Sequence, residues 1–86
     1  MKAVRMHGYG RVDQLYYEEA DEPRVAQPDE VVVRLKAAAI NHIDIWNRMG
    51  ATGIAFEMPH ILGADGAGIV VEVGENVANV KEGDAV

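Results

Sequence analysis

The most regular pattern in the chain is an alternation of apolar and polar positions over residues 30–39, "EVVVRLKAAA". One face of this segment carries Val31, Val33, Leu35 and Ala37, and the other carries Glu30, Val32, Arg34 and Lys36. A period of two residues is typical of a β-strand with one face toward a core and the other toward solvent. We therefore predict a strand here, with the Val31 face buried.

Other short segments favour strands because β-branched or aromatic residues dominate them and glycines or prolines bound them. They are Lys2–His7, Leu15–Ala20, Ala67–Gly74 and a strand that begins at the end of "ENVANVKEGDAV". The glycine-containing segment Gly8–Asp13 predicts a turn between the first two strands. The tyrosines at positions 9, 16 and 17 are expected to cover sheet surface and are assigned no other role.

The period changes from two residues to that of a helix in "INHIDIWNRMG", residues 40–50. One helical face carries His42, Ile45, Trp46 and Met49 at positions i, i+3, i+4 and i+7. Asn41 is a favourable N-cap and Gly50 suits the position after the last turn. We predict a helix over His42–Met49, an Asp44–Arg48 ion pair on it, and Trp46 and Met49 in the core.

Five strand segments and one short helix predict a mostly β domain, arranged as a partly closed barrel. The 86 residues suit a single domain. The chain ends within the fifth predicted strand, so we expect residues 1–86 to be the N-terminal part of a longer protein, and the barrel to be incomplete. The unpaired final strand predicts that an isolated 86-residue product would be oligomeric, domain-swapped or poorly soluble.

Charge and composition narrow the class of partner. With 8 Lys and Arg against 14 Asp and Glu, the net charge of −6 disfavours nucleic acid and anionic membranes. No apolar run reaches the roughly 18 residues of a membrane span, and the N-terminus lacks the apolar core of a signal peptide. The absence of cysteine excludes disulfides and thiolate zinc ligation by these residues. Together these features predict a cytoplasmic protein.

The glycine-rich segment "HILGADGAGIVVEVGENV", residues 60–77, resembles a phosphate-binding loop at first sight. Its spacing is G-x-x-G-x-G, the reverse of the dinucleotide fingerprint, and a strand rather than a helix follows it. We therefore interpret these glycines as allowing a sharp bend and a close backbone approach. The three histidines, His7, His42 and His60, have no spacing that predicts a metal site.

Two segments together, "AAAINHIDIWNRMG" and "MPHILGADGAGIVVEVGENVANVKEGDAV", resemble the medium-chain dehydrogenase/reductase family, the zinc-type alcohol dehydrogenase and quinone oxidoreductase superfamily. The resemblance extends over nearly the whole chain. It implies that residues 1–86 are the N-terminal part of a GroES-like catalytic domain. It also implies a Rossmann domain downstream, which would bind most of an NADP(H) or NAD(H) cofactor.

The positions that carry zinc ligands in zinc-dependent members differ here. Asn41 stands where those members have a cysteine, and Ala64 stands where they have a histidine. Ile43 replaces a proton-relaying Ser or Thr. The chain instead matches the pattern A-x-x-x-N-x-x-D-x-x-x-R-x-G of the zinc-free quinone oxidoreductases. This comparison implies that there is no catalytic zinc and that no residue of the chain is a metal ligand.

The resemblance implies three site residues: Asn41 as a catalytic hydrogen-bond donor that polarises a carbonyl, Asp44 as a catalytic-site carboxylate that supports the surrounding side chains, and His42 as a contact to the cofactor. Each also has a structural interpretation, as a helix cap or a helix-face residue. The expected function is metal-free, NAD(P)H-dependent reduction of a carbonyl, enone or quinone by a homo-oligomeric enzyme, with the 86 residues inactive alone. Two alternatives remain: a zinc alcohol dehydrogenase with displaced ligands, and a non-catalytic GroES-like binding or assembly module.

Overall fold

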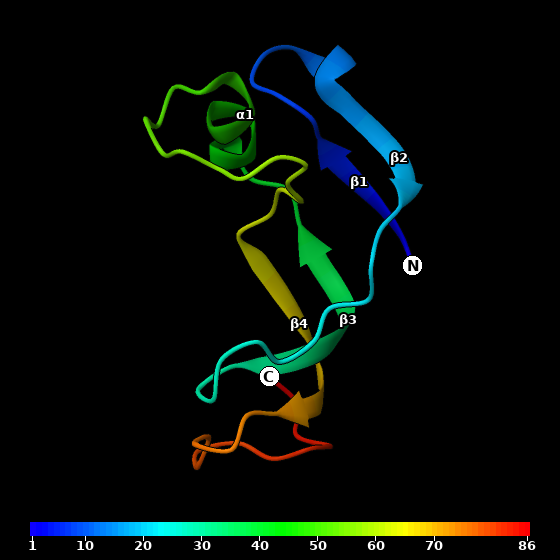
Figure 1. The fold of residues 1–86 in the computed structure, drawn as a ribbon, viewed down its shortest axis with the longest axis vertical. Coiled ribbons are helices and arrows are strands. Elements are labelled where there is room, and N and C mark those ends of the chain that lie inside the picture. The colour runs from blue at the N-terminus through cyan, green and yellow to red at the C-terminus, as the bar shows by residue number, and fades with distance from the viewer. The chain divides into compact units, whose positions relative to one another are not determined.

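A computed structural model describes residues 1–86, and the chain divides into two compact units. The first unit contains Met1–Asp21 and Ala39–Ala64, and the second contains Glu22–Ala38 and Asp65–Val86. Each unit includes one two-stranded sheet, and the α-helix belongs to the first unit (Figure 1). The candidate site residues at positions 41, 42, 44 and 64 all belong to the first unit.

The first unit begins with an antiparallel pair formed by β1 (Lys2–Met6) and β2 (Leu15–Glu19). Their register runs from Lys2 opposite Glu19 to Met6 opposite Leu15. Both predicted strands are confirmed, each one residue shorter at its C-terminal end. A short 3-10 helix, η1 (Val12–Gln14), lies within the connection, where only a turn and the residues after it were expected.

The helix α1 spans His42–Met49, as the sequence predicts. Asn41 is extended at φ −121° and ψ 160°, so the helix starts after it, and Gly50 adopts the left-handed conformation at φ 79°. A side chain is disfavoured in that conformation, which explains a glycine there. The N–H groups of Gly50 and Ala51 donate to the carbonyls of Asn47 and Trp46, at 3.2 and 2.9 Å, and close the last turn.

The second unit contains β3 (Val31–Ala39), apart from its last residue, paired with β4 (Asp65–Val73). A Cβ atom placed on Gly68 of β4 would lie 2.1 Å from the Arg34 carbonyl oxygen, so this glycine does permit a close backbone approach. Gly68 also exchanges two backbone hydrogen bonds of 2.9 Å with Val86. The fifth predicted strand therefore exists only as a single antiparallel bridge between Ile69 and Ala85.

The fully buried apolar side chains are few, namely Met6 and Val70. The predictions of burial are wrong for Trp46 and Met49, which are 50% and 58% exposed, and for the Val31 face of β3, where Val31, Leu35 and Ala37 are all exposed. The physical reason is that each unit has one two-stranded sheet without a second layer, so an apolar face has little to pack against.

The mostly β class with one short helix is confirmed, and the strands form two sheets of two strands each with no closed barrel. No helix has both the length and the apolar character that crossing a membrane requires. The site residues lie on a small scaffold, and hydrogen bonds between segments fix much of its geometry.

Candidate active site

Asn41 and Asp44 form a capping box at the start of α1. The Asn41 N–H donates to Asp44 Oδ2 at 2.9 Å, and the Asn41 side chain faces the Asp44 N–H. Two of the four N–H groups that a helix start leaves without helical partners lie in this box. Both residues are half-buried. The structure thus brings together two of the predicted site residues, and it gives both of them a structural role.

The second carboxylate oxygen of Asp44, Oδ1, is buried and has no hydrogen-bond partner. A buried acceptor without a donor costs about 1–3 kcal/mol, so such a group calls for an explanation. The predicted ion pair with Arg48 does not supply one and is wrong. Arg48 Nε instead donates to the Gly10 carbonyl at 3.0 Å, and the Gly10 N–H donates to the Arg48 carbonyl at 2.8 Å.

His42, the predicted cofactor contact, is exposed in the first turn of α1. Its ring lies 5.5 Å from the Trp46 ring, at an interplanar angle of 48°. The partial positive charge of a helix N-terminus favours anions such as phosphate near this position. Exposure, an imidazole donor and that local field make His42 chemically suited to contact a phosphate.

Potential metal ligands do not cluster in this chain. No three His, Cys, Asp or Glu side chains are grouped as potential metal ligands. Ala64 is exposed and offers no ligand atom. The ring of His60 stacks on Phe56 at 4.3 Å, while its backbone exchanges hydrogen bonds of 2.8 and 2.9 Å with Met6.

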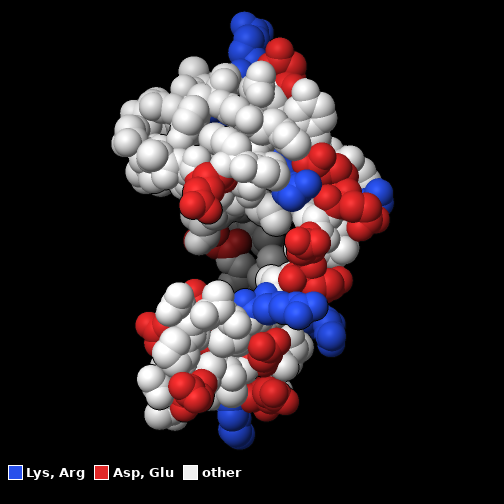
Figure 2. All heavy atoms as spheres, viewed as in Figure 1, with Lys and Arg blue, Asp and Glu red and all other residues white.

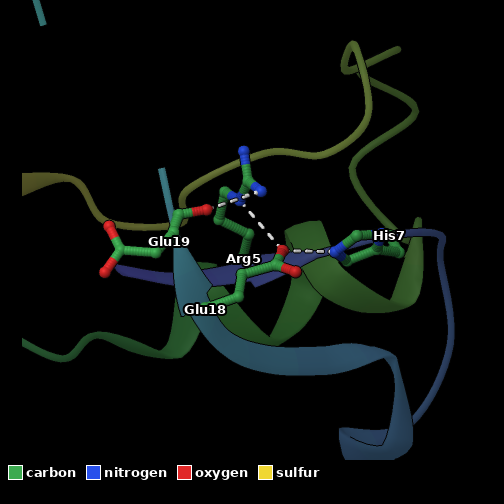
Figure 3. A network of polar contacts seen from close by, with 4 residues as sticks. All are labelled: Arg5, His7, Glu18 and Glu19. Atoms are coloured by element: carbon green, nitrogen blue, oxygen red, sulfur yellow. Dashed lines mark hydrogen bonds and ion pairs between the residues drawn. The ribbon is translucent and has the colours of Figure 1, made fainter. Parts of the chain in front are cut away.

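A polar network on the β1–β2 pair was not anticipated from the sequence (Figure 3). Arg5 Nε donates to Glu18 Oε1 at 2.9 Å, and His7 Nε2 bonds the same oxygen. The His7 hydrogen bond, helped by Arg5 and partly opposed by desolvation, lowers the pKa of the Glu18 carboxyl below its ordinary value. The register of the two strands would have indicated this contact. Ala3 lies opposite Glu18, and Arg5, two residues after Ala3, therefore lies on the same side of the sheet as Glu18. None of the predicted site residues joins this network.

Tyr9 also has a role that the sequence analysis missed. Its hydroxyl donates to the Ile54 carbonyl at 3.0 Å and accepts from the Phe56 N–H at 2.8 Å. Tyr9 was expected to cover sheet surface, but its hydroxyl instead holds the loop that follows α1. A tyrosine in a glycine-rich turn gives no signal of such a contact, because its partners are backbone groups 45 and 47 residues away in the sequence.

Comparison with known proteins gives a consistent result. The profile of the family described as "Alcohol dehydrogenase GroES-like domain" matches residues 27–86. A zinc-type alcohol dehydrogenase-like protein of Schizosaccharomyces pombe is 42% identical over 74 residues, covering 86% of this chain and 21% of that protein. The 2-methylene-furan-3-one reductase of Solanum lycopersicum is 38% identical over 87 residues, covering all of this chain and 22% of the reductase.

Among solved structures, the quinone oxidoreductase of Escherichia coli complexed with NADPH superposes with a TM-score of 0.86 at 33% identity. The superposition covers 99% of this chain and 26% of that protein. The chain therefore spans only about a fifth to a quarter of the length of these relatives. The similarity includes the whole candidate site at the start of α1.

Proposed function

The chain belongs to the alcohol dehydrogenase GroES-like domain family, and from this membership we propose that it forms part of the catalytic domain of an NAD(P)H-dependent oxidoreductase. The proposed reaction is reduction of a carbonyl, enone or quinone without a catalytic zinc ion. The zinc-free proposal rests on the residue types in the sequence: by the family resemblance, Asn41 and Ala64 stand at the two positions where zinc-dependent members have ligands. Neither residue is an ordinary zinc ligand.

Asn41 is the proposed catalytic residue, as a donor to the substrate carbonyl. An asparagine amide has an acceptor oxygen and an NH₂ donor, so capping the helix and donating to a substrate are chemically compatible. A donor aimed at the carbonyl oxygen stabilises the negative charge that develops there during reduction. The nicotinamide, when bound, supplies the hydride. The proton that neutralises the resulting alkoxide or enolate comes from water.

Asp44 and His42 complete the proposed site. The bond from the Asn41 N–H to Asp44 Oδ2 fixes the backbone of the donor residue. The buried Oδ1 of Asp44 is an acceptor for a donor group on the substrate or on a water molecule. His42 is exposed in the same helical turn, and we propose that it contacts a phosphate of the cofactor, most of which the remainder of the protein would bind.

Two sets of experiments on the full-length protein test this proposal. In the first, NADPH or NADH oxidation is measured with enone, quinone and aldehyde substrates, together with metal content and chelator sensitivity. Substrate-dependent oxidation that survives chelation supports the zinc-free oxidoreductase. Activity that disappears together with a stoichiometric zinc ion contradicts the proposal and favours the zinc-dependent alternative, which the similarity to the Schizosaccharomyces pombe protein motivates.

The second set separates catalysis by Asn41 from helix capping. Asn41→Ser keeps a good cap but removes the amide donor, whereas Asn41→Ala removes both functions. We expect kcat to fall about a hundredfold in both variants, as for loss of an oxyanion donor, with a lower melting temperature only in Asn41→Ala. The control is Asn76→Ser, the same change at an exposed position in the second unit. Normal kcat in Asn41→Ser would leave Asn41 as a cap alone.

The substrate is proposed to be a small molecule and the enzyme a cytoplasmic homo-oligomer. The net charge of −6 and the absence of a basic segment support a small-molecule ligand over nucleic acid. Sedimentation of the full-length protein tests the oligomeric state, and a monomer at all concentrations contradicts it. A full-length protein without turnover of any of these substrates would favour a non-catalytic GroES-like binding or assembly module.

A further inference from the structure

Three contacts attach the loop after α1, residues 50–60, to the N-terminal segment. Near the helix, Arg48 and Gly10 exchange two hydrogen bonds. In the middle, the Tyr9 hydroxyl bonds both Ile54 and Phe56. At the far end, His60 and Met6 exchange two backbone hydrogen bonds. Figure 1 shows this loop, green to yellow, around α1 and beside the segment that leaves β1. The N-terminal segment therefore determines the course of the loop.

The Tyr9 contact differs from the other two because a side chain makes it. Its hydroxyl acts as donor and acceptor on either side of Ala55, so one group holds a carbonyl and an N–H two residues apart. Its ring also lies against Gly50, where an added Cβ would be only 3.3 Å from Tyr9 Cδ1. A single substitution can thus release the middle of the loop while both ends stay attached.

The loop continues the chain from the helix that carries the proposed site. It starts directly after α1, which Asn41 caps and whose first turn contains Asp44, and it leads to Ala64. The Tyr9 hydroxyl forms hydrogen bonds with the Ile54 carbonyl and the Phe56 N–H, so these two polar backbone groups are not left open to a ligand. The side chain of Ile54 is 51% exposed. Figure 2 shows a broad, mostly uncharged surface in the region of α1 and this loop on the face in view, with acidic side chains at its lower margin.

From these contacts we infer that Tyr9 is a positioning residue of the proposed oxidoreductase. It holds residues 54–56 so that they form an apolar wall for the hydrocarbon part of a carbonyl substrate. This inference rests on the proposed function, because it assigns the loop to that active site. Tyr9 acts through the loop and not on the reacting atoms, so its loss weakens substrate binding and leaves the chemical step intact.

Tyr9→Phe in the full-length protein tests the inference, since the ring stays and only the hydroxyl is removed. The matched control is Tyr17→Phe, the same change on a tyrosine that is 73% exposed and whose hydroxyl makes no hydrogen bond. We expect KM for a long-chain enone to rise roughly three- to tenfold in Tyr9→Phe, the effect of about one lost hydrogen bond, with kcat within about twofold of wild type. The KM for NADPH stays unchanged in Tyr9→Phe. In Tyr17→Phe, neither the KM for the enone nor kcat changes.

Two further measurements separate positioning from simple destabilisation. Short-chain enones, which reach less of the apolar wall, are expected to show a smaller rise in KM than long-chain ones. Hydrogen exchange at the Phe56 amide is expected to accelerate in Tyr9→Phe, while the amides of α1 keep their protection. A lower melting temperature with equal losses for both substrates would instead show a purely structural role and overturn the inference.

The outcomes also separate this inference from the proposed function. A wild-type protein that oxidises NADPH with enones, together with a Tyr9→Phe variant of unchanged KM, overturns the role of Tyr9 and leaves the proposed function intact. A wild-type protein without oxidoreductase activity overturns the proposed function itself. The substrate role of Tyr9 is then rejected as well, even if exchange at Phe56 accelerates.

Discussion

Substitution of Gly68 by alanine is expected to disrupt the β3–β4 pair. An added Cβ would lie 2.1 Å from the Arg34 carbonyl oxygen and 2.9 Å from the Leu35 Cα, both of which are backbone atoms. Ordinary contact begins at 3.4 Å, so the oxygen would be about 1.3 Å too close. Strands lie about 4.8 Å apart, and a shift of that size breaks the adjacent inter-strand hydrogen bonds. Overpacking and the lost bonds together cost about 2–4 kcal/mol.

Gly66→Ala provides the matched control on the same strand. Its added Cβ would meet Leu35 Cδ2 at 2.7 Å, which is the far end of a flexible and 59% exposed side chain. That side chain can rotate away, and alanine restricts the unfolded chain, so the expected change is within about 1 kcal/mol of zero. Melting of the two full-length variants should differ by at least about 2 °C. Equal melting temperatures would refute the steric argument for Gly68.

Three other substitutions give shorter tests. Folding lowers the pKa of Glu18, so the stability that its carboxylate contributes is complete above pH 4.5 and is lost as the pH falls through the lowered pKa. In Glu18→Gln the melting temperature should therefore depend less on pH in that acid range than it does in the wild type. Gly50→Ala should destabilise by about 1–2 kcal/mol, because φ is 79°, and an unchanged melting temperature would contradict this. Asp44→Ala should cost about 1 kcal/mol in thermal melting through the lost cap, and Asp44→Asn should restore most of it.

The helix was predictable to the residue because its signals are local. Asn41 as the cap, the apolar positions at helical spacing and Gly50 in a left-handed conformation all act within one short segment. Strand positions followed from alternation or from β-favouring residues for the same reason, although β4 begins at Asp65, two residues before the predicted start. The predicted close backbone approach in the glycine run was confirmed at Gly68, where a Cβ atom would meet the Arg34 carbonyl oxygen. The glycine spacing did not match a dinucleotide fingerprint, so this structural use of a glycine was the better prediction.

Burial was not predictable from the same pattern. Alternation identifies which residues share a face, and whether that face is covered depends on a second layer. Leu35, Trp46 and Met49 are exposed because each unit has only one small sheet, and no local signal reports this. The Asp44–Arg48 pair failed for a related reason: Arg48 has a better partner in the Gly10 backbone, 38 residues away in the sequence.

The sequence by itself determined α1 and the four strands to within a few residues, the mostly β class, the residue types at the candidate site and the family they indicate. These are properties of neighbouring residues or of a residue's identity, and they survive without coordinates. Only the tertiary structure showed that Tyr9 holds the loop after α1, that His7 and Arg5 share Glu18, and that one oxygen of Asp44 is buried without a donor. Such facts depend on contacts between distant segments, and hydrogen bonds to the backbone leave no pattern in the sequence.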